Sequence, residues 1–233
     1  MKKYLVHFEI AGPAAMFARP DTGAAPISYP IPTWSACKAM FESVVRGFFS
    51  TGTDPAAFFC PTRVEVWMPV RFEKYVVNYR GPLRKTAQIK KGASYQLPAT
   101  ILVDVCFRVE GECTGIAGTH QGGVNVAHAM QDMFNRRLQK GLSKYAPCLG
   151  WKEFLPTYFG PYRDHPTTAP SPSLQSDLHL ALPAFLLAMW DAPVRGNYQP
   201  SFRELSVRGG VLRFPVATVV NGKLHFGEVP HAD

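Results

Sequence analysis

Residues 27–45 read ISYPIPTWSACKAMFESVV, and this stretch changes character halfway along. Its first half cannot be helical, because Pro30 and Pro32 lack an amide hydrogen and favour extended backbone. In the second half the apolar residues recur at the spacing of one helical face. We therefore expect a stiff, extended approach that leads directly into a first helix over residues 34–49. Thr33 is its expected N-cap, and Glu42 and Arg46 are expected to form an i,i+4 ion pair.

The segments on either side of this helix alternate between strand and helix patterns. Residues 2–10 and 63–69 alternate apolar and polar side chains, as half-buried strands do. Residues 100–109 form an apolar, β-branched run typical of a buried strand. Residues 124–140 carry the next helical stripe, which ends at Gly141.

Beyond residue 150 the chain has proline-rich loops followed by expected strands at 178–190, 202–208 and 210–216. The order of elements predicts an α+β protein with a ferredoxin-like (RRM-like) βαββαβ core. We expect this core to occupy residues 1–150 and a β-rich C-terminal region packed on it to occupy 151–233.

Residues 71–100 are unusually basic and are expected to form a β-hairpin inserted into the core. Tyrosines at positions 75, 79 and 95 are interleaved with the cations, and Glu73 is the one acidic residue. Basic groups on phosphates and aromatic rings on bases are how proteins hold single-stranded and hairpin RNA. The alternative is a solvated hairpin whose lysines simply extend into water. The cations of this segment are Arg71, Lys74, Arg80, Arg84, Lys85, Lys90 and Lys91.

The composition supports a globular protein with an acidic partner. The 233 residues are 46% hydrophobic and carry a net charge of +8, with a pI near 9.3. This balance favours nucleic acid over a membrane as the partner. The five cysteines include no Cys-x-x-Cys pair, and the longest apolar run is too short for a membrane span. We expect a soluble, cytoplasmic protein with reduced thiols, no zinc site and no cofactor.

Six short segments occur in an order that resembles a known family. With them, the sequence looks like the CRISPR-associated (Cas) family-five proteins, closest to the type I-C (Dvulg) branch. The segments are Gly12 to Phe17 with Arg19-Pro20, Ser28 to Thr33, Glu42-Ser43-Val44, Arg136-Arg137 to Gly141, Leu149 to Phe154, and Gly210 to Pro215.

The resemblance implies an RRM-like core, a β-rich C-terminal part and a role in antiviral defence. Proteins of this family hold the five-prime handle of CRISPR RNA (crRNA) at one end of the Cascade surveillance complex. There they contact the large subunit and the first backbone subunit, and they reach target DNA only through the complex. In the type I-C branch the same protein also cuts the precursor transcript at each repeat, as a metal-independent endoribonuclease.

The catalytic positions of that branch do not match in this sequence. The resemblance places them at Val45 and at Ala129-Met130, none of which can transfer a proton. His128, on the polar face of the expected helix, and His120, in the preceding glycine-rich loop, are the candidates that remain. The alternative for each histidine is a solvated surface residue without a catalytic role.

Outside the basic hairpin, further residues are expected to meet RNA. Tyr29 could present its ring beside the helix N-terminus, where amide groups bind phosphate, or it could pack on the core. Lys152 could bind phosphate with Glu153 orienting it, or the two could form a surface ion pair of small energetic value. Arg136 and Arg137 could converge with Lys152. No histidine–carboxylate spacing points to a metal site.

Two functions of the same subunit therefore stay open. The first is a crRNA-binding Cascade subunit that also processes precursor crRNA. The second is a non-catalytic cap of Cascade that leaves cutting to another nuclease. An unrelated small basic enzyme is a third alternative, for which the sequence offers no convergent catalytic constellation.

Overall fold

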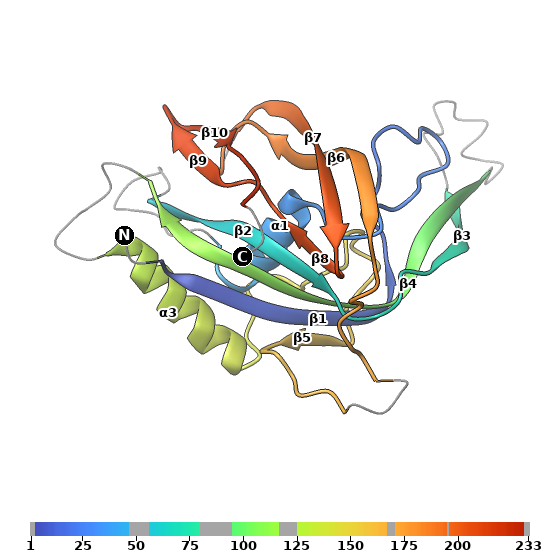
Figure 1. The fold of residues 1–233 in the computed structure, drawn as a ribbon, viewed down its shortest axis with the longest axis horizontal. Coiled ribbons are helices and arrows are strands. Elements are labelled where there is room, and N and C mark those ends of the chain that lie inside the picture. The colour runs from blue at the N-terminus through green and yellow to red at the C-terminus, as the bar shows by residue number, and fades with distance from the viewer. Residues whose placement is uncertain are drawn as a thin grey trace, which may run out of the picture.

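A computed structural model describes residues 3–46, 56–79, 95–116, 125–166, 171–194 and 196–230. Strands dominate the described residues, and two helices join them there, so the expected α+β class is confirmed (Figure 1). The elements are β1 (Leu5–Ala15), α1 (Trp34–Val44), β2 (Ala57–Val66), β3 (Phe72–Tyr79), β4 (Tyr95–Gly115), α3 (Val126–Gln139), β5 (Tyr158–Gly160), β6 (Leu180–Trp190), β7 (Tyr198–Arg208), β8 (Val211–Arg213), β9 (Ala217–Val220) and β10 (Lys223–Phe226).

One antiparallel sheet runs in the order β5-β1-β4-β2-β8-β7-β6, and β3 pairs with β4 outside this path. The 21 residues of β4 hold it together, because one half pairs with β1 and β2 and the other half pairs with β3. The sheet curls, so that β6, β7 and β8 rise over the long strands in Figure 1. A separate two-stranded sheet is formed by β9 and β10.

Both helices pack on one face of the long strands through fully buried phenylalanines. The ring of Phe41 in α1 lies edge-on to Phe8 of β1 at 4.8 Å between centroids. Phe134 of α3 packs at 5.4 Å against both Phe41 and Phe59 of β2. Each such ring contributes about 1.5–3 kcal/mol by leaving water. None of the described helices is long and apolar enough to cross a membrane.

The extended approach and the helix start are confirmed. Tyr29 pairs through its backbone amide with Phe17, and Ser28 does so with Thr100, which fixes the approach across the end of the sheet. The hydroxyl of Thr33 then accepts the amide hydrogen of Ala36 at 3.2 Å and caps α1.

The far end of α1 differs from the prediction. The helix ends at Val44, and the expected Glu42–Arg46 ion pair is wrong, because Glu42 pairs with Lys38 one turn earlier. The physical reason is burial: the Lys38 side chain is 10% exposed, so its ammonium group needs a nearby carboxylate more than the exposed Arg46 does.

The observed strand boundaries differ from the predicted ones. The strand expected at 2–10 continues to Ala15 through the Gly-Pro pair that was expected to be a loop. Pro13 is tolerated there because the β1–β4 ladder passes over it between Gly12 and Ala14. The short strands β5, β9 and β10 were not predicted, since three or four residues carry too little pattern.

Gly150 locks the loop after α3 onto the end of β1. Its φ is +88°, and a Cβ atom built there would lie 1.9 Å from the carbonyl oxygen of Met16. The neighbouring Leu149 accepts the Met16 amide hydrogen at 2.9 Å. Only glycine permits both the left-handed backbone and this close approach.

Replacing Gly150 by alanine should lower the free energy of unfolding by about 3 kcal/mol or more, measured by urea denaturation. Gly141→Ala is the matched control, because Gly141 also has a positive φ, +64°, but nothing lies within 4 Å of its added Cβ. It should cost only the left-handed backbone penalty of about 1–2 kcal/mol. Equal losses in the two variants would contradict the close-approach explanation.

Candidate functional site

A cluster of polar side chains surrounds His128 in the first turn of α3. The imidazole Nε2 lies 3.6 Å from the Asp132 carboxylate, one turn further along the helix. The ring also packs against Tyr4, with centroids 5.5 Å apart. The His128 side chain is 50% exposed, so a substrate can reach it.

Asn125 and two backbone bonds explain why these groups meet. The Asn125 side-chain oxygen accepts the His128 amide hydrogen at 3.1 Å and so caps α3, while its Nδ2 donates to the Tyr4 hydroxyl at 2.7 Å. Tyr4 is fixed by its carbonyl, which accepts from Cys113 of β4 at 2.8 Å. Gln131 ties α3 to the first residue of β1, Leu5, at 2.7 Å. The chain start therefore lies beside the start of α3 (Figure 1).

This arrangement is able to perform proton transfer. A solvent-accessible imidazole with a carboxylate and a phenol close to it has the parts of a general acid–base site. The carboxylate can orient the ring, as the third member of a catalytic triad does. The structure thus gives His128 neighbours that the sequence could not reveal, because Tyr4 is far from it along the chain.

The positions that the family resemblance made catalytic lie in or near the core. Val45 is 5% exposed and Met130 is fully buried, so neither can meet a substrate. Ala129 is half-buried and has no group that titrates. His120 lies outside the described residues.

The tip of the basic hairpin also lies outside the described residues. The arms are described: β3 and the first part of β4 pair from Phe72 to Tyr79, and Phe72 and Val76 are exposed apolar residues of β3. At the base, Arg71 donates to Asp104 of β4 at 2.6 Å. The expected RNA contacts that the structure does not describe are Arg80, Arg84, Lys85, Lys90 and Lys91.

Tyr29 corrects an expectation, because its ring is 5% exposed and cannot stack on a base. Its hydroxyl donates to the carbonyl of Ala184 at 2.7 Å and accepts the amide hydrogen of Leu186 at 3.2 Å. The ring packs on Phe185 at 4.8 Å. Burial raises the pKa of this phenol, so it stays protonated and can donate. Tyr29 therefore satisfies two backbone groups of β6, the last strand of the sheet.

The remaining predicted cations are Arg136, Arg137 and Lys152, and no described contact brings them together. Arg136 is exposed, and Arg137 is half-buried with an Nε that has no partner among the described residues. Lys152 and Glu153 are both exposed, and no ion pair joins them in the part of the chain that the structure describes.

A second polar cluster, which the sequence reading missed, lies on the sheet face opposite the helices. Glu9 of β1 is fully buried, and its carboxylate accepts from Arg163 at 2.7 Å and Arg108 at 3.1 Å. His165 lies 3.0 Å away on the same carboxylate. These contacts bind the segment that follows β5 across the face of the sheet. We call Glu9, Arg108, Arg163 and His165 the Glu9 network.

Aromatic rings sandwich the cations of this network. The Arg108 guanidinium lies 3.5 Å from the ring centroid of Trp67 and 4.7 Å from that of Tyr162. Arg163 stacks on Tyr158 at 3.6 Å. Such contacts stabilise a desolvated cation by about 2 kcal/mol or more. The Glu9 carboxylate at the centre of the network is fully buried, so the network stabilises the fold.

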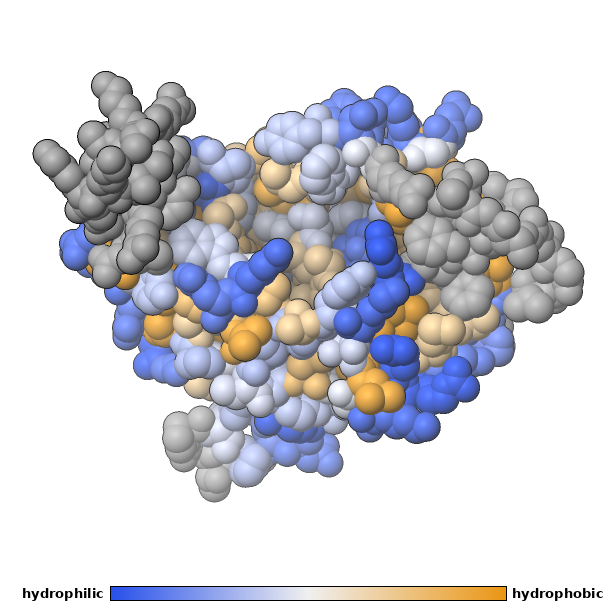
Figure 2. Space-filling model, turned by 180° about the vertical axis from the view of Figure 1, so that it is seen from behind, coloured by the Kyte–Doolittle hydropathy of each residue, from blue (hydrophilic) through white to orange (hydrophobic). Residues whose placement is uncertain are grey.

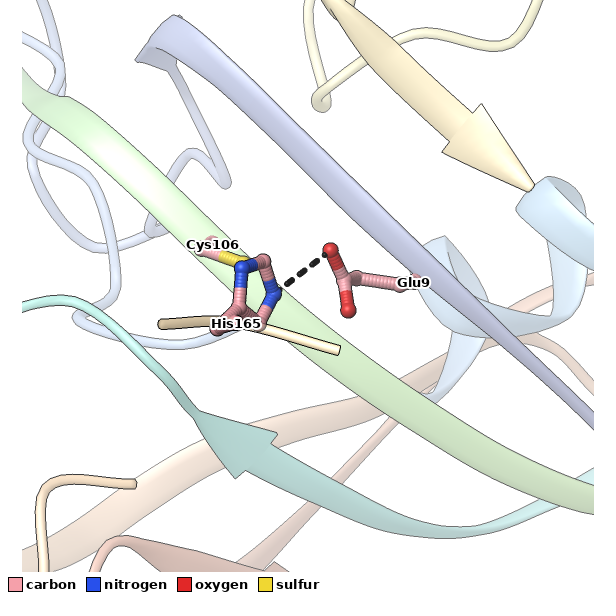
Figure 3. Close-up of side chains that lie close together, drawn as sticks. All are labelled: Glu9, Cys106 and His165. Carbon is pink, nitrogen blue, oxygen red and sulfur yellow. Dashed lines mark hydrogen bonds and ion pairs between the residues drawn. The ribbon is translucent and has the colours of Figure 1, made fainter. Parts of the chain in front are cut away.

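Glu9 and His165 of this network lie with the neighbouring Cys106 in a group close enough to hold a metal ion, which Figure 3 draws. Their chemistry does not fit a cation. Both Glu9 oxygens already accept hydrogen bonds from guanidinium groups. Burial raises the pKa of the Cys106 thiol to about 12, so it is a protonated thiol and a poor ligand.

The hint of this network in the sequence is a charged residue inside each of two apolar strands, Glu9 in β1 and Arg108 in β4. A buried charge needs a partner. The partners of Glu9 depend on the pairing register of β1 with β4 and on the position of residues 161–166. The sequence pattern predicts neither of these.

Replacing Glu9 by glutamine should lower the free energy of unfolding by about 3–5 kcal/mol at pH 7, because Arg108 and Arg163 lose the buried counter-charge that they share. Glu73→Gln is the matched control, since Glu73 lies exposed on β3, and it should change stability by less than about 0.5 kcal/mol. Denaturant titration measures both. A Glu9→Gln variant as stable as the control would show that the network contributes nothing.

The cost of Glu9→Gln should also depend on pH. Burial alone would raise the pKa of Glu9, but hydrogen bonds from Arg163, Arg108 and His165 outweigh it, so the pKa lies below the ordinary 4.5. Such a carboxylate stabilises the folded state above pH 4.5 and loses this contribution as the pH falls through its lowered pKa. The stability gap between wild type and Glu9→Gln should therefore narrow in acid. A gap that is constant from pH 7 to pH 3 would contradict this.

No family model matches the chain. Curated relatives do match nearly all of it. It is 25% identical over 227 residues to the CRISPR pre-crRNA endoribonuclease Cas5d of Mannheimia succiniciproducens, covering 90% of this chain and 94% of the relative. It is 27% identical over 232 residues to the protein of the same name from Thermus thermophilus, covering 89% and 90%.

Solved structures share the fold. A CRISPR-associated protein superposes with a TM-score of 0.63 at 15% identity, covering 91% of this chain and 92% of its own. A functionally uncharacterized protein from Streptococcus mutans gives 0.61 at 16% identity, covering 90% and 91%. With the motif order found in the sequence, these similarities over about nine-tenths of the chain confirm the resemblance: the chain is similar to the CRISPR-associated family-five proteins, and in sequence to their Cas5d branch.

Proposed function

We propose that this protein binds the repeat RNA of a CRISPR transcript and cuts the precursor without a metal, with His128 as its acid–base residue. The observation that carries the catalytic assignment is the exposed cluster of His128, Tyr4 and Asp132 at the start of α3. Among the described residues, this is the histidine that combines solvent access with a carboxylate and a phenol.

The relatives support the substrate class. Both curated relatives are named as pre-crRNA endoribonucleases, and the match covers about nine-tenths of the chain. The non-catalytic cap is therefore the less favoured alternative. The net charge of +8 agrees with an RNA partner. In this proposal the other partners are the Cascade backbone and large subunits, and target DNA is met only through the complex.

The reaction needs two proton movements. The ribose 2′-hydroxyl attacks the adjacent phosphorus as a base removes its proton, and the 5′-oxygen leaves as an acid supplies one. The products are a 2′,3′-cyclic phosphate and a 5′-hydroxyl end, so no water or metal enters this step. His128 takes the 2′ proton, Asp132 orients its ring, and the phenol of Tyr4 gives a proton to the leaving 5′-oxygen.

In this proposal two groups of cations hold the RNA. The predicted hairpin residues supply one group of positive charges. Arg136 and Arg137 on α3 and Lys152 after it supply a second group, in which the exposed Arg136 and Lys152 are the accessible members.

We also propose that β1, α1, β2, β4, α3 and β5 form a ferredoxin-like core. The strand order β5-β1-β4-β2, antiparallel between neighbours, supports this, with β3 as part of the inserted hairpin. Strands β6 to β10 then make the C-terminal region.

The purified chain should be incubated with its own repeat RNA in EDTA. Cleavage at one position, leaving a cyclic phosphate, supports the proposal, and tight binding with intact RNA would support the structural cap. Affinity should fall steeply with salt, because phosphate contacts release counterions. Repeat RNA that the protein neither binds nor cleaves would contradict both functions.

His128→Ala should reduce the single-turnover cleavage rate by about 10²- to 10⁴-fold while leaving the Kd for repeat RNA within about two-fold. His179→Ala is the matched control, because His179 is an exposed histidine outside the cluster. Tyr4→Phe tests the neighbour and should slow cleavage less. Full activity of His128→Ala would remove this residue from the mechanism.

A further inference from the structure

A hollow of about 470 Å³ opens between the outer side of α1 and residues 145–150. Its volume lies within the range of about 300–1,000 Å³ that is usual for small-ligand sites. The helix α1 lies behind the sheet in Figure 1, on the side that Figure 2 turns toward the reader, where apolar patches lie among long hydrophilic side chains. We call the cavity between α1 and residues 145–150 the α1 hollow.

The α1 hollow has an apolar floor and a cationic rim. Small or flexible apolar residues line it, and Tyr145 and Arg46, both exposed, stand at its margin. The Lys144 ammonium lies 5.9 Å from the centroid of the Tyr145 ring. Within the described residues, neither Arg46 nor Lys144 is held in an ion pair. The floor residues are Ala36, Ala39, Met40, Ala146 and Pro147.

The aromatic margin is held in place by the end of α1. The carbonyl of Ser43 accepts the amide hydrogens of Lys144 at 2.7 Å and Tyr145 at 3.0 Å. Glu42 also lines the hollow, but its charge is neutralised by Lys38. The local charge is therefore positive, and the Tyr145 ring, which is 50% exposed, is presented by a fixed backbone.

We infer that the α1 hollow binds one unpaired nucleotide of the repeat RNA. The base lies on the apolar floor and stacks on Tyr145, and the phosphates beside it meet Arg46 and Lys144. A flat ligand with an anionic backbone fits this combination of alanine floor, aromatic ring and unpaired cations. A purely apolar protein side chain would leave these cations without a counter-charge.

This inference rests on the proposed function, yet it concerns a different place. His128 lies in the first turn of α3, and residues 141–145 follow the last turn, so the helix rise separates them by about 20 Å. RNA cut at His128 would therefore be held at a point several nucleotides away. The α1 hollow sets which part of the repeat is held open, and it does not take part in proton transfer.

Tyr145→Ala should raise the Kd for repeat RNA by about five-fold or more, because the stacking free energy of one base on an aromatic ring corresponds to at least about this factor in Kd. Tyr145→Phe should retain binding, because phenylalanine keeps the stacking face. Tyr198→Ala is the matched control: Tyr198 is 63% exposed on β7, far along the chain, and its loss should leave the Kd unchanged. Fluorescence anisotropy with labelled repeat RNA measures all three.

Filling the hollow gives an independent test. Ala39 is exposed on α1 and lines the hollow, so Ala39→Trp should block the base while leaving the helix intact, as circular dichroism can check. Ultraviolet cross-linking of wild type should join one repeat nucleotide to the 141–150 segment, and Ala39→Trp should abolish that cross-link.

The outcomes separate this inference from the proposed function. If wild type binds and cuts repeat RNA but Tyr145→Ala and Ala39→Trp bind it equally well, the hollow is not a nucleotide site and the proposed function stands. If the wild-type protein does not bind repeat RNA, the proposed function is contradicted, and the inference that rests on it is contradicted too. If the variants lose binding of another protein and keep RNA binding, the hollow is a protein-docking site and the inference is overturned.

Discussion

The register between β1 and β4 is the constraint on which the rest of the structure depends. It sets Glu9 opposite Arg108 and Phe8 opposite Val109. Because side chains alternate across a strand, this register sends one set of residues to the helices and the other to the Glu9 network. A slip of one residue would place charges under α1 and α3 and phenylalanines on the open face. The network and the phenylalanine core therefore support the same register from opposite sides of the sheet.

The two candidate functional places use the ends of the helices that this sheet carries. The His128 cluster forms where β1 begins and α3 begins, because Asn125 bonds to both the Tyr4 hydroxyl and the helix amide. The α1 hollow forms where α1 ends and the loop after α3 bonds back to Ser43. Both lie on the surface, where a ligand can reach them. Backbone or capping hydrogen bonds hold the residues of both in place.

Tyr29 shows why a correct local reading can miss a role. The prolines around it do make the approach stiff and extended, and α1 does begin at the residue after Thr33. The ring nevertheless turns inward, because two backbone groups of β6 need partners at the margin of the sheet. An unpaired strand edge invites association with other chains, and a buried phenol that bonds to it reduces that hazard. Nothing near Tyr29 in the sequence signals a strand 155 residues away.

By itself, the sequence determined the α+β class, the extended approach, the cap of α1, the extent of α3 and the resemblance to the family-five proteins, because these depend on spacing and composition within short segments. The tertiary structure alone decided that the Tyr29 ring turns into the core, that Tyr4 stands beside His128, and that Glu9 meets Arg163 and His165. Each of these needs the pairing of segments far apart in the chain. Such pairing is selected by the burial of the whole sheet, which no single stretch of sequence contains.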